Sequence, residues 1–146
     1  MTGISAEEYL RQLGNINAAI NQDIRRLEEM RMNALSGGGA IRYDKDKVQG
    51  SAADTMGAAV ISIVDLDARI NQTIDRYVDA REKIIEQIRG LHNELYTKIL
   101  YDIYVKGMNL RDTADDVGRS YNNVMNHRKM AVALFGETYA PFDYLV

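Results

Sequence analysis

The sequence predicts an all-α fold, in which a long antiparallel, coiled-coil-like helical hairpin is followed by a C-terminal helix-turn-helix. Three observations lead to this expectation. The 146-residue chain contains one proline and no run of strand-like alternation. Apolar residues recur at steps of three and four over two long segments. Near the end of the chain, two glycines and two helix-capping residues follow one another at helix-turn-helix spacing.

The first predicted helix runs from Ser5 to about Leu35. Ser5 and Glu8 form a capping box, in which each side chain can satisfy the other residue's backbone N–H. Three consecutive glycines and a charged stretch then predict a mobile loop over residues 36–51, which is long for a helix–helix connection. The apolar face of this helix comprises Leu10, Leu13, Ile20, Ile24, Leu27 and Ala34.

The second predicted helix begins at Ser51 or Asp54 and completes a hairpin domain over residues 1–90. A hairpin folded about residue 43 would place Leu27 near Val60. The residues with which this helix would face the first one form a row that we call the seam. Asp67 belongs to it and is either buried beside Asn17 or Asn21, or lies at the edge of the seam. The part of the seam beyond Tyr77 outruns the first helix and is expected to pack on the C-terminal region. The seam comprises Met56, Val60, Ile63, Asp67, Ile70, Ile74, Tyr77, Arg81, Ile84 and Ile88.

Residues 91–136 are predicted to form the helix-turn-helix domain. A third long helix should follow a join at Gly90 and His92 and end at Gly107, where glycine can adopt a left-handed conformation. Asn109 can cap a short fourth helix that Gly118 ends, and Ser120 can cap the last helix, expected over residues 120–135. The apolar positions are Leu91, Leu95, Ile99, Leu100 and Ile103 on the third helix, Leu110, Ala114 and Val117 on the fourth, and Val124, Ala131 and Leu134 on the last.

The outward surface of the last predicted helix is a candidate DNA-binding site. No acidic residue occurs from Val117 to Gly136, whereas basic and amide side chains are frequent there. Arg and Lys attract phosphates, and Asn can hydrogen-bond base edges when the helix enters the major groove. A plain three-helix corner with a solvated polar surface would use the same caps. The candidate residues are Arg119, Ser120, Tyr121, Asn122, Asn123, Met125, Asn126, Arg128 and Lys129.

The last third of the chain resembles region 4 of sigma-70 factors, whose helix-turn-helix carries a similar L-x-x-x-A-x-x-x-G-x-S-x-x-x-V-x-x-x-x-x-x-A pattern, here at Leu110, Ala114, Gly118, Ser120, Val124 and Ala131. With the hairpin in front, the whole chain looks like the ArpU and RinA type of phage transcriptional regulator. This resemblance implies double-stranded DNA as a partner. RNA polymerase and a second copy of the chain are further candidate partners.

Composition argues against several other classes of protein. The absence of cysteine excludes disulfides and thiolate metal sites. His92 and His127 stand alone, and no nucleophile is paired with a base, so neither a metal, a cofactor nor an enzymatic activity is expected. A net charge of −3 disfavours a purely electrostatic DNA coat. No apolar run has the length of a signal peptide or a membrane span, so a cytoplasmic location is expected.

Two other functions fit the same pattern. A small terminase subunit also joins a helix-turn-helix to helical hairpins, but it builds rings on phage DNA. A purely structural or partner-binding helical protein would use the turn only as a corner. The C-terminal tail, residues 137–146, could fold back on the core or dock on a neighbour or on RNA polymerase; we expect the fold-back.

Overall fold

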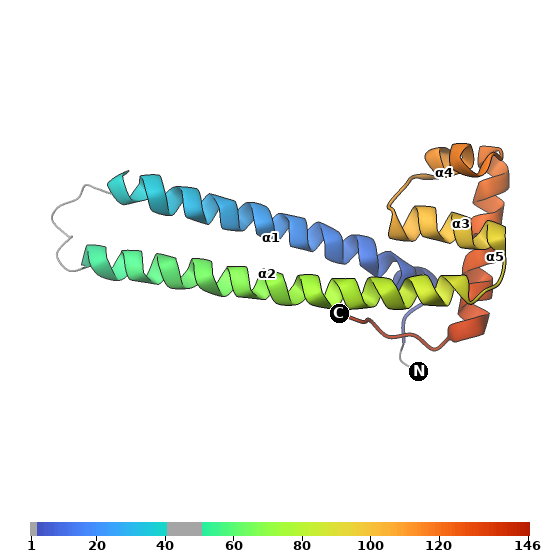
Figure 1. Ribbon diagram of the computed structural model, residues 1–146, viewed down its shortest axis with the longest axis horizontal. Coiled ribbons are helices and arrows are strands. Elements are labelled where there is room, and N and C mark those ends of the chain that lie inside the picture. The colour runs from blue at the N-terminus through green and yellow to red at the C-terminus, as the bar shows by residue number, and fades with distance from the viewer. Residues whose placement is uncertain (1–2, 41–50) are drawn as a thin grey trace. The chain divides into compact units, whose positions relative to one another are not determined.

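The computed structural model describes residues 3–40 and 51–146. This part of the chain is helical and contains no strand, apart from an isolated bridge between Ile4 and Phe142. The predicted all-α class is therefore confirmed. The elements, shown in Figure 1, are α1 (Ala6–Ala40), α2 (Ser51–Arg89), α3 (Glu94–Leu100), the π-helical segment η3 (Tyr101–Val105), α4 (Leu110–Val117) and α5 (Tyr121–Tyr139).

The chain divides into two compact units, each of which contains parts of both long helices. One unit combines Met1–Asn17 with Arg76–Val146, and the other is Ala18–Asp75. Both α1 and α2 therefore contribute residues to each unit. The reason is that the start of α1 and the end of α2 share a hydrophobic core with the C-terminal helices.

The core of the first unit joins the two ends of the chain. Leu10 of α1, Ile84 and Ile88 of α2 and Phe135 of α5 are all fully buried in it. The seam beyond Tyr77 thus packs on the C-terminal helices, as predicted, but it does not outrun α1, because Leu10 belongs to the same cluster. Near the end of α5, Phe135 is buried in place of the predicted Leu134, which is half-buried.

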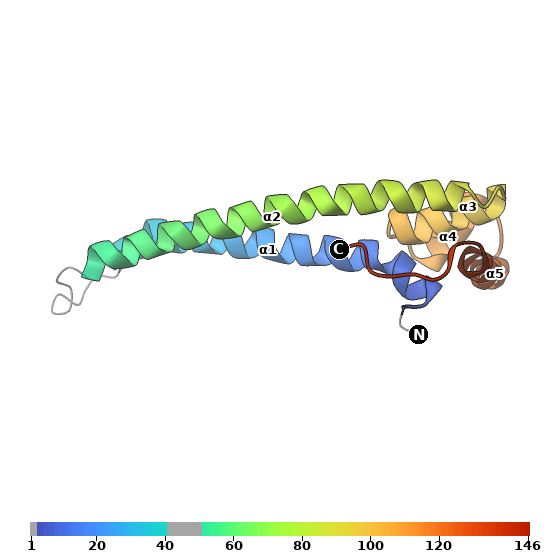
Figure 2. The ribbon, with the colours of Figure 1, turned by 90° about the horizontal axis from the view of Figure 1, so that it is seen from below.

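The C-terminal tail folds back on this core, as expected. Phe142 is 5% exposed, and its ring lies 4.6 Å from that of Tyr9 and 5.6 Å from that of Phe135, measured between centroids. Figure 2 shows the C-terminal segment running back along the first turns of α1, where the Leu145 N–H donates to Gln12 Oε1 at 2.8 Å. The tail begins later than residue 137, because α5 continues to Tyr139, whose hydroxyl donates to the Gln87 carbonyl.

In the second unit α1 pairs with α2, but in a different register from the predicted one. Leu27 packs with Leu66 and Ile70, whereas Val60, its expected neighbour, is 55% exposed. The reason is that α1 continues through Ala40, five residues into the loop predicted over 36–51. Each glycine costs a helix about 1 kcal/mol, yet extending an existing helix adds one hydrogen bond per residue. The remainder of the predicted loop, residues 41–50, lies outside the described residues.

Asp67 lies at the edge of the seam, which is one of the two alternatives left open by the sequence. Its side chain is 48% exposed, and its Oδ1 lies 3.8 Å from Nη2 of Arg31. A half-exposed ion pair of this length contributes little to stability. Asp67 therefore needs no buried amide from Asn17 or Asn21, both of which are exposed.

The predicted join at Gly90 and His92 is present, and the third helix follows it as two contiguous elements, the α-helical α3 and the π-helical η3, rather than as one regular α-helix from Leu91. The chain breaks after Arg89, where His92 adopts a positive φ of 54°, a conformation uncommon for a residue with a side chain. Asn93 then accepts a hydrogen bond from the Tyr96 N–H at 3.0 Å and caps α3, which begins at Glu94. Leu91 consequently lies before the helix, where it packs on the core of the first unit.

Shortening Phe135 tests the importance of the core of the first unit. Phe135→Ala should lower the free energy of unfolding by about 3–5 kcal/mol, because it leaves a cavity among Leu10, Ile84 and Phe142. The measurement is urea denaturation followed by circular dichroism. Met130→Ala on the same helix is the control: Met130 is 53% exposed, and the change should stay within about 0.5 kcal/mol. Equal losses in the two variants would contradict this description of the core.

Candidate nucleic-acid interface

Helix α4 is short because only eight residues lie between its N-cap, Asn109, and its C-cap, Gly118. At its start, Asn109 Oδ1 accepts from the Asp112 N–H at 2.7 Å. At its end, Gly118 has the left-handed φ of 71° that favours glycine, and the Arg119 N–H donates to the Ala114 carbonyl at 3.0 Å. Both caps were predicted from the sequence, and Gly107, before the helix, also has a positive φ.

Two residues separate the C-cap of α4, Gly118, from the start of α5 at Tyr121. Ser120 is extended, and its Oγ accepts from the Asn123 N–H at 3.1 Å, as predicted. A small core of Ile99, Ala114 and Val124 then joins α3, α4 and α5, with Leu110 and Val117 packed against it. These five predicted apolar positions of α3, α4 and α5 therefore lie in one cluster. Thr113, which the sequence reasoning missed, is also fully buried beside Ala114 on α4.

Most of the predicted site residues lie on the exposed side of α5 or at its start. Tyr121 is 46% exposed, and Asn123 and Met125 are half-buried. Asn123 Oδ1 accepts from Arg119 Nη1 at 3.3 Å, so this amide is engaged with its neighbour. Met130, which the sequence reasoning did not select, is exposed beside them. The other exposed members of the predicted set are Arg119, Ser120, Asn122, Asn126 and Lys129.

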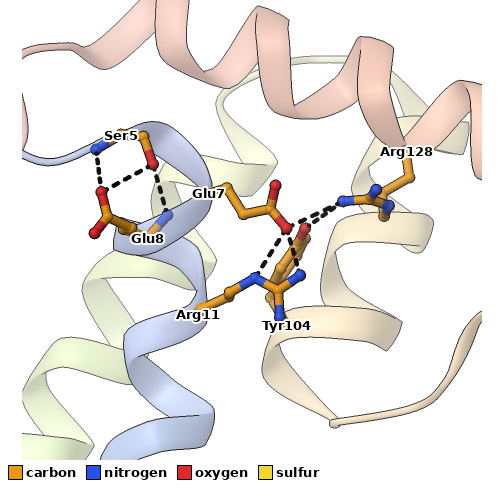
Figure 3. Close-up of polar contacts among 6 residues, drawn as sticks. All are labelled: Ser5, Glu7, Glu8, Arg11, Tyr104 and Arg128. Atoms are coloured by element: carbon orange, nitrogen blue, oxygen red, sulfur yellow. Dashed lines mark hydrogen bonds and ion pairs between the residues drawn. The ribbon is translucent and has the colours of Figure 1, made fainter.

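Arg128 does not point outward, contrary to expectation. Its side chain is 18% exposed. Figure 3 shows its guanidinium reaching the phenol of Tyr104 and the carboxylate of Glu7: Nη1 donates to the Tyr104 hydroxyl at 3.0 Å and lies 3.4 Å from Glu7 Oε2. The reason is visible in the spacing, because Arg128 follows Val124 by four residues and precedes Ala131 by three. It therefore belongs to the inner face.

The residues around Arg128 form a polar border to the core of the first unit. Glu7 also accepts from Arg11 Nε at 2.9 Å, while Ser5 and Glu8 form the predicted capping box at the start of α1 (Figure 3). Burial raises the pKa of the Tyr104 phenol, and the hydrogen bond from Arg128 opposes that shift. These contacts fix the inner side of α5 against α1 and η3.

A buried carboxyl group on η3 was not foreseen from the sequence. The Asp102 side chain is 4% exposed, and its Oδ1 lies 3.9 Å from Lys106 Nζ. Burial, followed by the hydrogen bond with Asp116 and its charge, raises the pKa of Asp102 from 3.8 to about 6. The same hydrogen bond lowers the pKa of Asp116, which also lies 3.7 Å from Lys98 Nζ. The Asp102 carboxyl group therefore binds a proton more readily than an exposed aspartate does.

Within residues 3–40 and 51–146, no three His, Asp or Glu side chains are grouped so that they could hold a metal ion. None of the helices in this described part is both long enough and apolar enough to cross a membrane.

Comparisons of the chain with protein-family models, with curated proteins and with solved structures found no match.

Replacing Asp102 tests the raised pKa of its carboxyl group through the pH dependence of stability. Because the folded-state pKa is raised from 3.8 to about 6, the folded protein retains a proton that the unfolded chain releases between these values. The ionisation of Asp102 therefore lowers the free energy of unfolding as pH rises through that window, and this loss remains in full at higher pH. Asp102→Asn should raise the free energy of unfolding at about pH 7.5 by about 1–3 kcal/mol.

The same comparison at about pH 4.5 should give a clearly smaller gain, since wild-type Asp102 is then protonated in the folded state. Urea denaturation at the two pH values provides the measurement, with Asp115→Asn, at an exposed position of α4, as the control. A variant whose effect is the same at both pH values would show that the pKa of Asp102 is not raised.

Arg128 and Lys129 are adjacent cations with different expected roles. Arg128→Ala should lower the free energy of unfolding by about 1–2 kcal/mol, because it removes the hydrogen-bond donor to the Tyr104 hydroxyl. Lys129→Ala, at an exposed position, should change it by less than about 0.5 kcal/mol. Thermal and urea denaturation of the pair measure the difference. Indistinguishable stabilities would place Arg128 outside the inner face.

Proposed function

We propose that the exposed face at the start of α5 binds double-stranded DNA in the major groove, and that α4, the turn at Gly118 and α5 act as a helix-turn-helix. The protein would then be a cytoplasmic phage or prophage transcriptional regulator. One observation supports the proposal most directly: this exposed face combines Arg119, Asn122, Asn126 and Lys129 with no acidic residue from Val117 to Gly136.

The start of α5 differs in charge from the starts of α1, α3 and α4. Acidic side chains in the first turn normally complement the positive end of a helix dipole. They are present in α1 (Glu7 and Glu8), α3 (Glu94) and α4 (Asp112), but α5 has none. An uncompensated helix N-terminus with cations nearby is favourable for phosphate binding.

The contacts of α5 also suit a helix that is inserted into a groove. Val124, Ala131 and Phe135 are fully buried on its inner side, and Arg128 is bonded to Tyr104 there, so the helix is held firmly. Asn122 and Asn126 are four residues apart and therefore share the outer side, where their amides could reach base edges.

The exposed acidic residues of α4 limit how DNA could approach. Asp112 and Asp115 would repel phosphates if they faced the backbone of the DNA. We therefore propose that the duplex contacts α5 and the turn, and that the acidic side of α4 faces away from it. RNA polymerase is a candidate partner for that acidic side.

Selection of bound sequences from random double-stranded DNA, followed by fluorescence anisotropy against salt concentration, tests the proposal. Arg119→Gln and Lys129→Gln should each weaken binding to all sequences and reduce the salt slope by about one. Asn122→Ala or Asn126→Ala should instead lower discrimination at one base position by about 1–3 kcal/mol, while non-specific affinity is kept.

Lys83→Gln is the matched control, because it removes an exposed cation from α2 of the same compact unit. It should leave both affinity and salt slope unchanged. Absence of binding even at low salt would refute the proposal and favour a helical protein that binds only protein partners. A control variant as impaired as Lys129→Gln would show that binding is diffuse rather than centred on α5.

A further inference from the structure

The second unit, Ala18–Asp75, exposes an apolar surface in addition to the one that joins its two helices. The sequence has no charged residue from position 55 to position 64 of α2. In this stretch Ile63 packs toward α1, whereas Met56, Val60, Ile61 and Val64 are 55–62% exposed. A helix that is apolar on several sides is normally covered on those sides in the functional protein.

Helical geometry places these side chains on one side of the α1–α2 pair. Successive residues turn by about 100°, so Val64 lies about 100° from the inward-facing Ile63, and Val60 lies about 60° from it in the same sense. On α1, Leu35 lies about 80° from the buried Leu27 and is 82% exposed. The helices α1 and α2 run in opposite directions (Figure 1). Residues that are displaced from the contact line by the same sense of rotation about each helix axis therefore lie on the same side of the helix pair. Leu35 therefore extends the surface formed by α2.

The size of this surface matches half of a small but specific protein interface. The exposed parts of Leu35, Met56, Val60, Ile61 and Val64 amount to roughly 500–600 Å², at about 160–200 Å² for each side chain when free. Monomeric proteins rarely leave contiguous apolar patches of more than a few hundred Å² uncovered. Two such surfaces in contact would bury about 1,000–1,200 Å², which is the size at which specific protein interfaces begin.

We propose that this apolar surface, formed by Leu35, Met56, Val60, Ile61 and Val64, is the contact through which a second copy of the chain binds to form a dimer. A two-fold interface brings the same patch of both copies together, so the patch must be complementary to itself. An aliphatic patch without charges meets this condition. The border of the patch is also complementary to itself, because the neighbouring Arg31 and Asp67 offer a positive and a negative charge to the other copy.

Sedimentation velocity and light scattering on the full-length chain test the proposal, which does not depend on DNA binding. The wild-type chain should form a dimer with a dissociation constant of about 1–10 μM. Val60→Glu or Val64→Glu would place a carboxylate in the contact and should weaken dimerisation by at least about 100-fold. Ser62→Glu is the matched control, since it adds the same charge at an exposed position on the opposite side of α2; it should remain dimeric. Circular dichroism verifies that all variants keep their helix content.

Cross-linking gives a second, positional test, because the chain contains no cysteine. A short bis-maleimide reagent should link two copies of the Val60→Cys variant or of the Val64→Cys variant, but not of the Ser62→Cys variant. The proposal is overturned if the wild type stays monomeric throughout the measured concentrations. It is also overturned if Ser62→Glu dissociates the dimer as strongly as Val60→Glu does, or if Val60→Glu leaves the assembly intact.

Discussion

The burial of Phe135 between the beginning of α1 and the end of α2 is the interaction on which the C-terminal region depends. Its ring lies against that of Phe142, and it belongs to the same cluster as Leu10 and Ile84, so residues from both ends of the chain meet in this core. A cluster of this kind gains its free energy from apolar area removed from water. Because the cluster holds the second half of α5, the first half of that helix can present polar side chains to solvent and still keep a fixed position.

The geometry at the start of α5 has a second, local origin. A helix of eight residues such as α4 is not stable alone, since nucleation of a helix costs more than so few hydrogen bonds return. Asn109 and Gly118 satisfy its ends, and Ala114 seals it against Ile99 and Val124. The caps determine where the chain turns, and this small core determines which side of α5 is buried. The opposite, polar side of α5 is therefore exposed.

The sequence was sufficient for the features that depend on neighbouring residues. The capping box at Ser5, the caps at Asn109 and Ser120 and the left-handed Gly118 follow from residue type and spacing. Features that depend on distant parts of the chain were missed. The register of α1 on α2 depends on how far α1 continues. The three consecutive glycines predicted that this helix ends before them, whereas it continues through Ala40. The inward position of Arg128 can be read from its spacing to Val124 and Ala131, but its partners Tyr104 and Glu7 come from other elements. The partner of the buried Asp102 is Asp116 of α4, which local spacing does not reveal either.

The most direct test of the account is an amide NMR titration of the isotope-labelled, full-length chain with a short duplex at low salt. We expect the largest shifts at Arg119, Tyr121, Asn122, Asn126 and Lys129, and small shifts at Ile84, Phe135 and the exposed apolar residues of α2, because only the outer side of α5 would contact the duplex. Shifts concentrated on α2, or an unchanged spectrum at saturating duplex, would contradict the assignment of α5 as the DNA-binding helix.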